Sequence, residues 1–340
     1  MLVFILVNTS TRCTLRYKLS LVSISTRCTL HYKLAIVSIS THCILRQTTI
    51  IGDIPEYPLS PLEKMPIAHV NSINIHYEIS GPTTGPWLVL VNGLADDLHT
   101  WSSNIPAFTA AGHRVLAFDN RGIGQTSRPT GPYTASLLAS DLHALLQYLR
   151  ITGFHLLGVS MGGMIAQAYA LTYPNGSAAA KGSEMLSLSL CCTYAQPSVF
   201  CQRMFGLWAE MAERMSVQDV MRDVTLWAFT VDFFRKRTGE LEEVERAMRG
   251  LDMGTGEYLA QLNAVRRFDS VVALEGLRKG GRGLGGLESG RVMVLAGEED
   301  ILIPVVLSRE LHEAVPSSLW KTTRGGHGCL VSQIHVMWTR

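Results

Sequence analysis

The chain has 340 residues, of which 47% are hydrophobic, enough to bury the core of one large domain or two small ones. The 30 Lys and Arg residues nearly balance the 28 Asp and Glu residues, so the net charge of +2 gives no reason to expect nucleic acid or an anionic membrane as a partner. The longest apolar runs are shorter than the roughly 20 residues of a membrane-spanning helix, so we expect no membrane span. Seven cysteines without metal-ligand spacing predict reduced thiols, no bound metal and a cytoplasmic location.

The first 64 residues differ from the rest because they contain a repeat. Ser-Thr-Arg-Cys-Thr-Leu at 10–15 returns at 25–30 and, slightly changed, at 40–45. The copies begin 15 residues apart, a period shorter than that of most known solenoid repeats. Copies this similar indicate recent tandem duplication. We interpret residues 1–64 as a disordered or wrongly annotated repeat segment, with the working protein beginning at Met65. The alternative is a mitochondrial targeting segment, since Arg, Ser and Thr are frequent and acidic residues are absent before Asp53. Amino-terminal sequencing of the native protein distinguishes the two.

The chain after Met65 begins with predicted strands. Alternating apolar residues over 67–79 predict an antiparallel hairpin. Residues 87–91 form a continuous apolar run, which is typical of a strand buried on both faces of a parallel sheet. This run ends at Asn92-Gly93-Leu94, and a further strand is expected over 114–119.

A glycine-rich turn carries the candidate nucleophile. A predicted helix over 139–149 precedes an apolar strand over 154–159, and helical periodicity follows the turn. Between strand and helix, Ser160 lies in the pattern Gly-x-Ser-x-Gly, with Gly158 and Gly162 on either side. A serine at the tip of a strained turn needs neighbours without side chains, and this context is that of a nucleophile elbow. We therefore predict that Ser160 stands above the sheet at the positive end of a helix.

The hydrophobic period changes after the next strand, which is expected over 185–192. From 197 to 268 the period is helical, and the segment is rich in Met, Phe and Trp, which suit a deformable apolar pocket. The glycine-rich stretch 276–290 neither follows a strand nor contains the Gly-Lys-Ser/Thr of a phosphate loop. We expect a flexible insertion there.

Two more polar candidates follow the last predicted strands. The strand over 291–297 leads into Glu298-Glu299-Asp300, and the strand over 319–322 leads into a glycine-rich loop that contains His327. A helix is expected between them, over 308–315. The chain order of serine, acid and histidine, each after a strand, is typical of a catalytic triad.

From about residue 65 to His327 the sequence resembles the α/β-hydrolase fold superfamily, in its group of esterases, enol-lactonases and cofactor-free haloperoxidase-like enzymes. The resemblance implies an α/β fold with a doubly wound, mostly parallel sheet over 65–340 and a helical cap at about 197–268. The family's Gly-x-x-Asp-x-x-x-Pro loop matches 297–304, which favours Asp300 over the two glutamates. The implied triad is Ser160, Asp300 and His327.

The resemblance also implies an oxyanion hole made by the backbone N–H groups of Leu94 and Met161. Asn92 stands where the family usually has histidine, but the donors are backbone groups, so the difference need not abolish activity. In this fold the loop after Asp119 is structural, so we assign Asp119 no catalytic role. The resemblance implies no cofactor.

We expect a serine hydrolase that cleaves a small ester or lactone through an acyl-enzyme, with an apolar or aromatic substrate and no nucleic-acid or membrane partner. Two alternatives remain open. One is a cofactor-free haloperoxidase-like enzyme, distinguished by halide- and peroxide-dependent halogenation. The other is a catalytically weak small-molecule receptor, because only 13 residues follow His327 where the family usually has a full helix.

Overall fold

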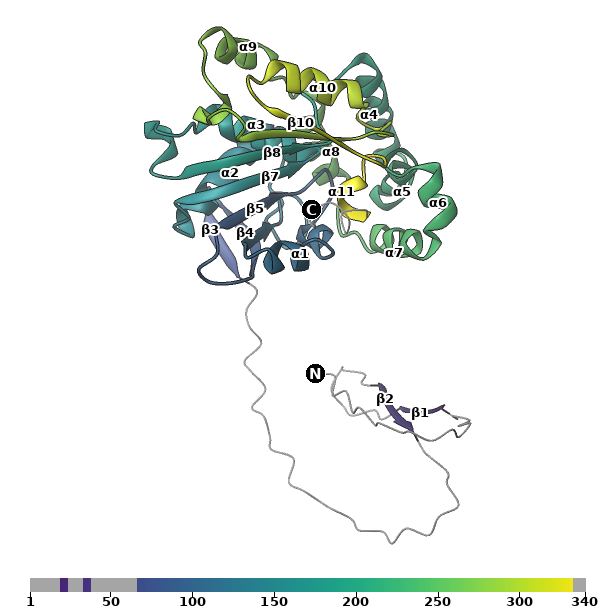
Figure 1. Ribbon diagram of the computed structural model, residues 1–340. Helices are drawn as coiled ribbons and strands as arrows, with labels where there is room; N and C mark the ends of the chain where they lie inside the picture. The colour runs from purple at the N-terminus through teal and green to yellow at the C-terminus, as the bar shows by residue number, and fades with distance from the viewer. Residues whose placement is uncertain (1–18, 24–32, 38–65, 333–340) are drawn as a thin grey trace, which may run out of the picture. The chain divides into compact units, whose positions relative to one another are not determined.

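The computed structural model describes residues 19–23, 33–37 and 66–332, and the chain divides into two compact units, Met1–Leu62 and Glu63–Arg340 (Figure 1). In the first unit, strands β1 (Leu19–Ser23) and β2 (Lys33–Val37) pair antiparallel. The two strands cover nearly the same part of successive repeat copies, offset by one residue. The other residues of the predicted 1–64 segment lie outside the described residues, and the interpretations of that segment stay predictions.

The second unit is built on an eight-stranded sheet with the order β10-β9-β8-β7-β5-β6-β4-β3. Strands β5 to β10 pair in parallel, while the β3–β4 hairpin is antiparallel and joins β6 at the edge. The chain passes from β5 to β6 on one side and then to β7 on the other, so the order reverses between β5 and β7. Ligands of open α/β sheets bind at the carboxyl ends of strands at such a reversal. The strand bounds are β3 (Ile67–Val70), β4 (Ile73–Ser80), β5 (Trp87–Val91), β6 (Arg114–Phe118), β7 (Gly153–Val159), β8 (Glu184–Cys191), β9 (Val292–Gly297) and β10 (Leu319–Thr323).

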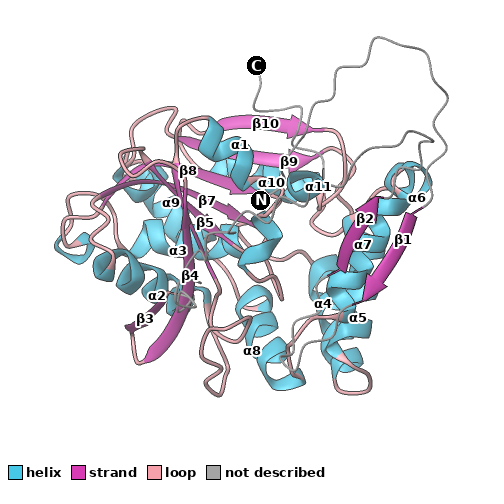
Figure 2. Ribbon diagram, turned by 90° about the horizontal axis from the view of Figure 1, so that it is seen from below, coloured by secondary structure: helices cyan, strands magenta, loops and turns pink. Residues whose placement is uncertain are grey.

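Helices cover both faces of this sheet (Figure 2). In β5, Val89 and Val91 belong to a large buried cluster with residues of α2 (Ala135–Tyr148), α3 (Met161–Thr172) and α10 (Val305–Ala314). Leu88 and Leu90 belong to a smaller cluster with residues of η1 (Leu98–Trp101), α1 (Ile105–Ala110) and α11 (Cys329–Ser332). Successive side chains of a strand point to opposite faces, so the alternation requires two covered faces. The predicted doubly wound α/β fold is confirmed.

Six helices lie between β8 and β9, and α4 to α7 gather on one side of the sheet in both ribbon views (Figures 1 and 2). Several begin at a hydroxyl side chain that accepts a backbone N–H: Ser198 for α4, Ser216 for α5 and Thr230 for α6. Such caps satisfy an N–H that lacks a partner in the first helical turn. We call α4 to α8 the cap. The helices are α4 (Val199–Ala212), α5 (Val217–Ala228), α6 (Val231–Lys236), α7 (Thr238–Arg249), α8 (Thr255–Arg266) and α9 (Val271–Lys279).

Two local expectations differ from the structure. Helix α2 begins four residues before the predicted start, because the Thr134 hydroxyl accepts the Leu137 N–H at 3.1 Å and caps the helix there. The glycine-rich stretch 276–290 was expected to be a flexible insertion, but residues 284, 285 and 287 are buried, whereas 278–282 and 288–290 are exposed. Its short helix η3 (Leu284–Gly286) buries Leu284 completely, and the Gly285 carbonyl accepts the Asn175 N–H at 2.9 Å. Glycines alone therefore did not indicate flexibility, because apolar residues between them reach the core.

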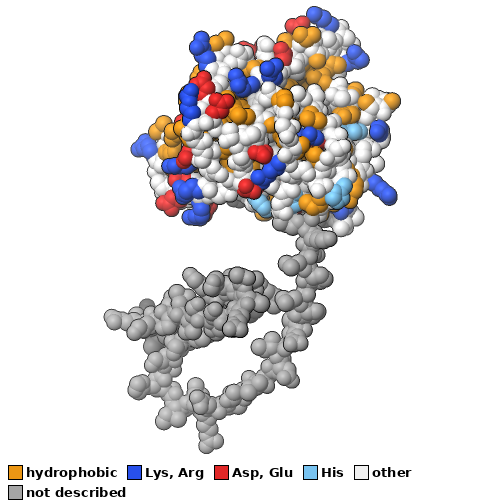
Figure 3. Space-filling model, turned by 180° about the vertical axis from the view of Figure 1, so that it is seen from behind, with side chains coloured by type: hydrophobic (Ala, Val, Ile, Leu, Met, Phe, Trp, Pro, Cys, Tyr) orange, Lys and Arg blue, Asp and Glu red, His pale blue; other side chains and the backbone are white. Residues whose placement is uncertain are grey.

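The surface of the second unit carries charges of both signs. Figure 3 shows Lys and Arg side chains lying among Asp and Glu on the face drawn, with hydrophobic side chains scattered between them. Some of these charges pair along helices, as Lys236 does with Asp232 at 2.6 Å. Within the described ranges, every helix is too short or too polar to cross a membrane.

Candidate active site

Ser160 occupies the sharp turn between β7 and α3. Its backbone has φ 57° and ψ −119°, a conformation that side-chain-bearing residues rarely adopt, and its N–H donates to the Cys191 carbonyl at 2.9 Å. The turn requires the two glycines of the Gly-x-Ser-x-Gly pattern. A Cβ on Gly158 would lie 2.2 Å from the Gly162 carbonyl oxygen, and one on Gly162 would lie 2.1 Å from the Val91 carbonyl oxygen. The geometry is that of a nucleophile elbow.

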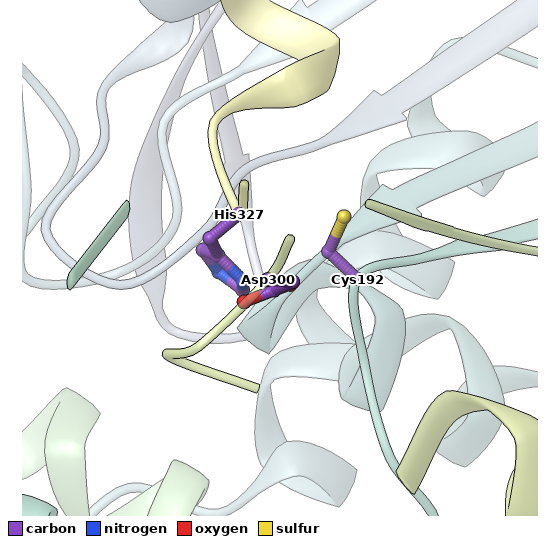
Figure 4. Close-up of side chains that lie close together, drawn as sticks. All are labelled: Cys192, Asp300 and His327. Carbon is purple, nitrogen blue, oxygen red and sulfur yellow. Dashed lines mark hydrogen bonds and ion pairs between the residues drawn. The ribbon is translucent and has the colours of Figure 1, made fainter. Parts of the chain in front are cut away.

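Asp300 and His327 form a hydrogen-bonded pair at the ends of β9 and β10 (Figure 4). His327 Nδ1 lies 2.9 Å from Asp300 Oδ2, and the side chain of Asp300 is fully buried while 11% of the His327 side chain is exposed. The other oxygen of Asp300, Oδ1, accepts the N–H groups of Leu302 at 3.0 Å and Ile303 at 2.9 Å. A carboxylate held in this way keeps the imidazole proton on Nδ1 and leaves Nε2 as an acceptor.

The two rival acids lie elsewhere. Glu298 is exposed and accepts a hydrogen bond from the Thr322 hydroxyl at 3.0 Å, and Glu299 is also exposed. The structure therefore brings Asp300 to His327 and leaves both glutamates in solvent.

A cavity of about 330 Å³ brings Ser160 and His327 together beneath the cap. Its floor includes residues that follow β5, β7 and β10, so it lies at the carboxyl ends of the strands, where the strand order reverses. Its roof comes from α4, α5 and α7 and is mainly apolar. The roof residues are Phe205, Trp208, Met221, Val224, Thr225, Ala228, Glu243, Val244, Ala247 and Met248.

The predicted oxyanion donors lie on either side of Ser160. Leu94 lines the cavity, and Met161 is the first residue of α3. Neither N–H donates to an acceptor within the part of the chain that the structure describes. The Leu94 turn is close to Ser160, because a Cβ on Gly93 would lie 3.6 Å from Ser160 Cβ. Both amides are therefore available to an anion that forms beside Ser160.

Asn92 anchors this turn. Its amide nitrogen donates to the carbonyls of Phe118 at 3.1 Å and Asp96 at 3.2 Å, and its oxygen accepts the Trp101 indole N–H at 2.5 Å. The side chain is completely buried. A buried amide with these bonds fixes the turn, so the shape of the turn does not depend on histidine at this position.

Gln261 of α8 is a second anchor, which the sequence did not reveal. This fully buried side chain accepts the Ala95 N–H at 3.0 Å and donates to the Arg121 carbonyl at 2.9 Å. It thereby connects the cap to the turn that contains Leu94. A glutamine within a helix carries no local signal of such a contact, since its partners lie 140 and 166 residues away.

Asp96 is a further cavity residue that the sequence analysis did not single out. It is half-buried, and burial raises the pKa of its carboxyl to about 6, with the charge of Asp97 adding to the rise and that of His327 opposing it. Hydrogen bonds from the Thr100 side chain and the Gly93 N–H also oppose the rise. The signal available in the sequence was a pair of acids directly after the oxyanion turn.

Cys192 lies near the Asp300–His327 pair (Figure 4). One atom of each of the three residues that could bind a metal ion lies within 4.8 Å of the other two. Asp300 Oδ2 and His327 Nδ1 already bond each other, so the arrangement fits a hydrogen-bonded pair better than a metal site. Cys192 Sγ also lies 3.6 Å from Cys329 Sγ. The hydrogen bond with Cys329 and then burial raise the pKa of the Cys192 thiol well above its usual value, so this thiol stays protonated at neutral pH.

The remaining polar candidates have structural partners. Asp119 is buried and accepts the Leu98 N–H at 2.8 Å and the Gln125 N–H at 3.0 Å, and it lies 2.7 Å from His76 Nδ1. These contacts hold the loops around β6, as expected for a structural acid. His143 lies in α2 and His155 in β7, and neither lines the cavity.

Comparison with known proteins gives consistent matches over the second unit. The family described as "alpha/beta hydrolase fold" matches residues 86–330. A protein from Azorhizobium caulinodans named "Putative carbamate hydrolase RutD" is 25% identical over 254 residues, which cover 75% of this chain and 88% of that protein. An enol-lactonase from Burkholderia xenovorans superposes with a TM-score of 0.67 at 25% identity, covering 79% of this chain and 94% of that one. An esterase from Thermogutta terrifontis has a TM-score of 0.63 at 24% identity, covering 77% and 89%.

Proposed function

The chain belongs to the α/β-hydrolase fold family of enzymes, and we propose that it is a serine hydrolase that cleaves a small carboxylic ester or lactone. In this proposal His327 Nε2 takes the proton of Ser160 as the serine oxygen attacks the substrate carbonyl. Asp300 holds the imidazole and stabilises its charged form, and the N–H groups of Leu94 and Met161 bind the oxyanion. Water then repeats the cycle on the acyl-enzyme and releases the acid.

One observation carries this proposal. Ser160, on its strained turn, and His327, hydrogen-bonded to the buried Asp300 at 2.9 Å, line the same cavity, and the three residues follow three different strands. A turn of this kind is costly to the fold, and such strain persists where a reactive group must be held in place. A hydrolytic triad accounts for all three features together.

The cavity supports a small, largely apolar substrate. A volume of about 330 Å³ lies at the lower end of the range for small-molecule sites, and Phe205, Trp208 and Met221 line its roof. The match to a protein named for carbamate hydrolysis makes carbamate esters the second acyl class to test.

Hydrolysis of a panel of 4-nitrophenyl esters, carbamates and small lactones tests the proposal. The full chain should hydrolyse at least one class, and Ser160→Ala should lower kcat/KM about a thousandfold or more. Ser136→Ala is the matched control, since Ser136 is exposed on α2 and should leave kcat/KM within twofold, roughly the spread of such assays. Equal rates in Ser160→Ala and the native sequence would contradict the proposal.

A further inference from the structure

Asp96 and Ser160 both lie next to Gly93, beside the position that a side chain there would take. An ideal Cβ on Gly93 would lie 2.8 Å from Asp96 Oδ2 and 3.6 Å from Ser160 Cβ, so one small space separates the carboxylate from the nucleophile. The triad described above already contains its own acid, Asp300, and does not use Asp96. The second carboxyl group therefore needs a separate account.

The cavity offers this carboxylate no permanent cation. The Thr100 side chain and the Gly93 N–H lie close enough to Asp96 to lower the pKa of its carboxyl, but these two groups leave part of its acceptor capacity open. The ionisable residues that line the cavity are Asp96, Glu243, His99 and His327, and no Lys or Arg lines it. A carboxylate in an apolar cavity is unfavourable unless a cation or further donors reach it. A bound substrate is the partner that could supply them.

The aromatic residues that line the cavity favour the same kind of partner. Phe205, Trp208 and Phe229 line the cavity together with Asp96. Aromatic faces attract ammonium groups, most strongly where water is excluded. The exposed carboxylate of Glu243 adds negative charge to the same cavity and would repel an anion.

We propose that Asp96 is a specificity-determining residue that binds an ammonium group of the substrate a few bonds from the scissile carbonyl. This inference rests on the proposed serine hydrolase function and names its substrate class: esters that carry a cationic amine, with carboxylate-bearing esters disfavoured. Asp96 and Ser160 both lie close to the Cβ position of Gly93, which limits the distance between the ammonium group and the carbonyl. An ammonium group held by Asp96 therefore lies close to a carbonyl that Ser160 attacks.

Matched ester pairs that differ only in charge test this inference with the full chain. On the acyl side, the pair is 4-nitrophenyl 4-(trimethylammonio)butanoate and its neutral isostere, 4-nitrophenyl 5,5-dimethylhexanoate. On the alcohol side, the pair is butyrylcholine and 3,3-dimethylbutyl butyrate. At least one charged ester should have a kcat/KM about tenfold or more above that of its neutral isostere, and Asp96→Asn should remove most of that ratio.

Asp97→Asn is the matched control. This change removes the same charge from the next residue, which does not line the cavity. The Asp97 side chain instead accepts the His99 N–H at 2.9 Å. Most of the charge ratio should survive this change. If Asp96 acted only on the imidazolium of His327, Asp96→Asn would lower kcat for charged and neutral esters equally and leave their ratio intact, which would overturn the inference.

Binding without turnover separates the two proposals. If no ester is hydrolysed, the serine hydrolase proposal fails, and the charge preference is then measured with choline against 3,3-dimethylbutan-1-ol. Choline should raise the Tm of the full chain more than the neutral alcohol does, and Asp96→Asn should abolish that difference. Equal stabilisation by the two ligands, or a preference that survives Asp96→Asn, would overturn the assignment of Asp96.

Discussion

His327 Nδ1 lies 2.9 Å from Asp300 Oδ2, on a carboxylate whose other oxygen is held by the N–H groups of Leu302 and Ile303. The carboxylate therefore cannot rotate without losing backbone hydrogen bonds. Its position fixes which imidazole nitrogen carries the proton, and the unprotonated nitrogen is the one needed to activate a serine.

Replacing Asp300 with Asn should keep the shape of this pair but reverse its hydrogen bonding. The new amide can donate to Nδ1 and so moves the imidazole proton to Nε2, where it blocks proton transfer from Ser160. We expect kcat to fall by about 10³ to 10⁴ while KM changes little, measured by ester hydrolysis. Glu298→Gln, an exposed control, should keep the native kcat. A kcat for Asp300→Asn within about tenfold of the native value would contradict the assigned role.

The elbow glycines should be intolerant of even a methyl group. In Gly162→Ala the Cβ would meet two backbone oxygens, at 2.1 Å for Val91 and 2.8 Å for Asn92. These atoms cannot move aside without disturbing the carboxyl end of β5, which is paired on both sides. We expect the free energy of unfolding to fall by about 3 kcal/mol, measured in urea.

Gly256→Ala provides the matched control, because Gly256 is the second residue of α8 just as Gly162 is the second residue of α3. A Cβ there would have no neighbour within 4 Å. Alanine should raise the free energy of unfolding by about 0.5 to 1 kcal/mol through its better helix propensity. Equal effects of the two substitutions would show that contact at the elbow is not the cause.

Much of the fold could be predicted because each strand carries its own signal. The apolar run 87–91 and the Gly-x-Ser-x-Gly turn identify their elements locally, and the order of Ser160, Asp300 and His327 needs no contact information. Gln261 and Asp96 could not be found in this way. Gln261 is defined by partners far away in the chain, and Asp96 becomes distinctive only when the cap covers a cavity that no Lys or Arg lines.

Gln261 should position the oxyanion loop from the cap. In Gln261→Met, which is close in volume, the Ala95 N–H and the Arg121 carbonyl lose their buried partner, so unfolding should become easier by about 1 to 3 kcal/mol. Because the loop carries the Leu94 donor, kcat should fall more than KM changes. Loss of stability with an unchanged kcat in the protein that remains folded would show that Gln261 serves the fold alone.

The raised pKa of Asp96 predicts a pH-dependent stability. The folded state holds this proton up to about pH 6 and the unfolded chain only to about 3.8, so ionisation of Asp96 destabilises the fold increasingly between these values and fully above pH 6. Asp96→Asn removes the penalty. The variant should therefore be more stable than the native sequence by an amount that increases with pH. This difference in the free energy of unfolding should increase by about 2 kcal/mol from pH 4 to pH 7, a value reduced for partial solvent access.

Urea unfolding at pH 4, 5, 6 and 7 measures this gain. Glu310→Gln, an exposed change on α10, serves as the control and should show no comparable growth. A constant difference between Asp96→Asn and the native sequence across this range would mean that Asp96 is not held in a charge-disfavouring site.

The most direct measurement of the central claim is covalent labelling by a fluorophosphonate probe, followed by mass spectrometric mapping of the modified peptide. The account predicts one labelled residue, Ser160, at neutral pH, with labelling lost in Ser160→Ala and strongly slowed in Asp300→Asn and His327→Ala. A folded protein that is not labelled, or is labelled at another serine, would contradict the assignment of Ser160 as the nucleophile.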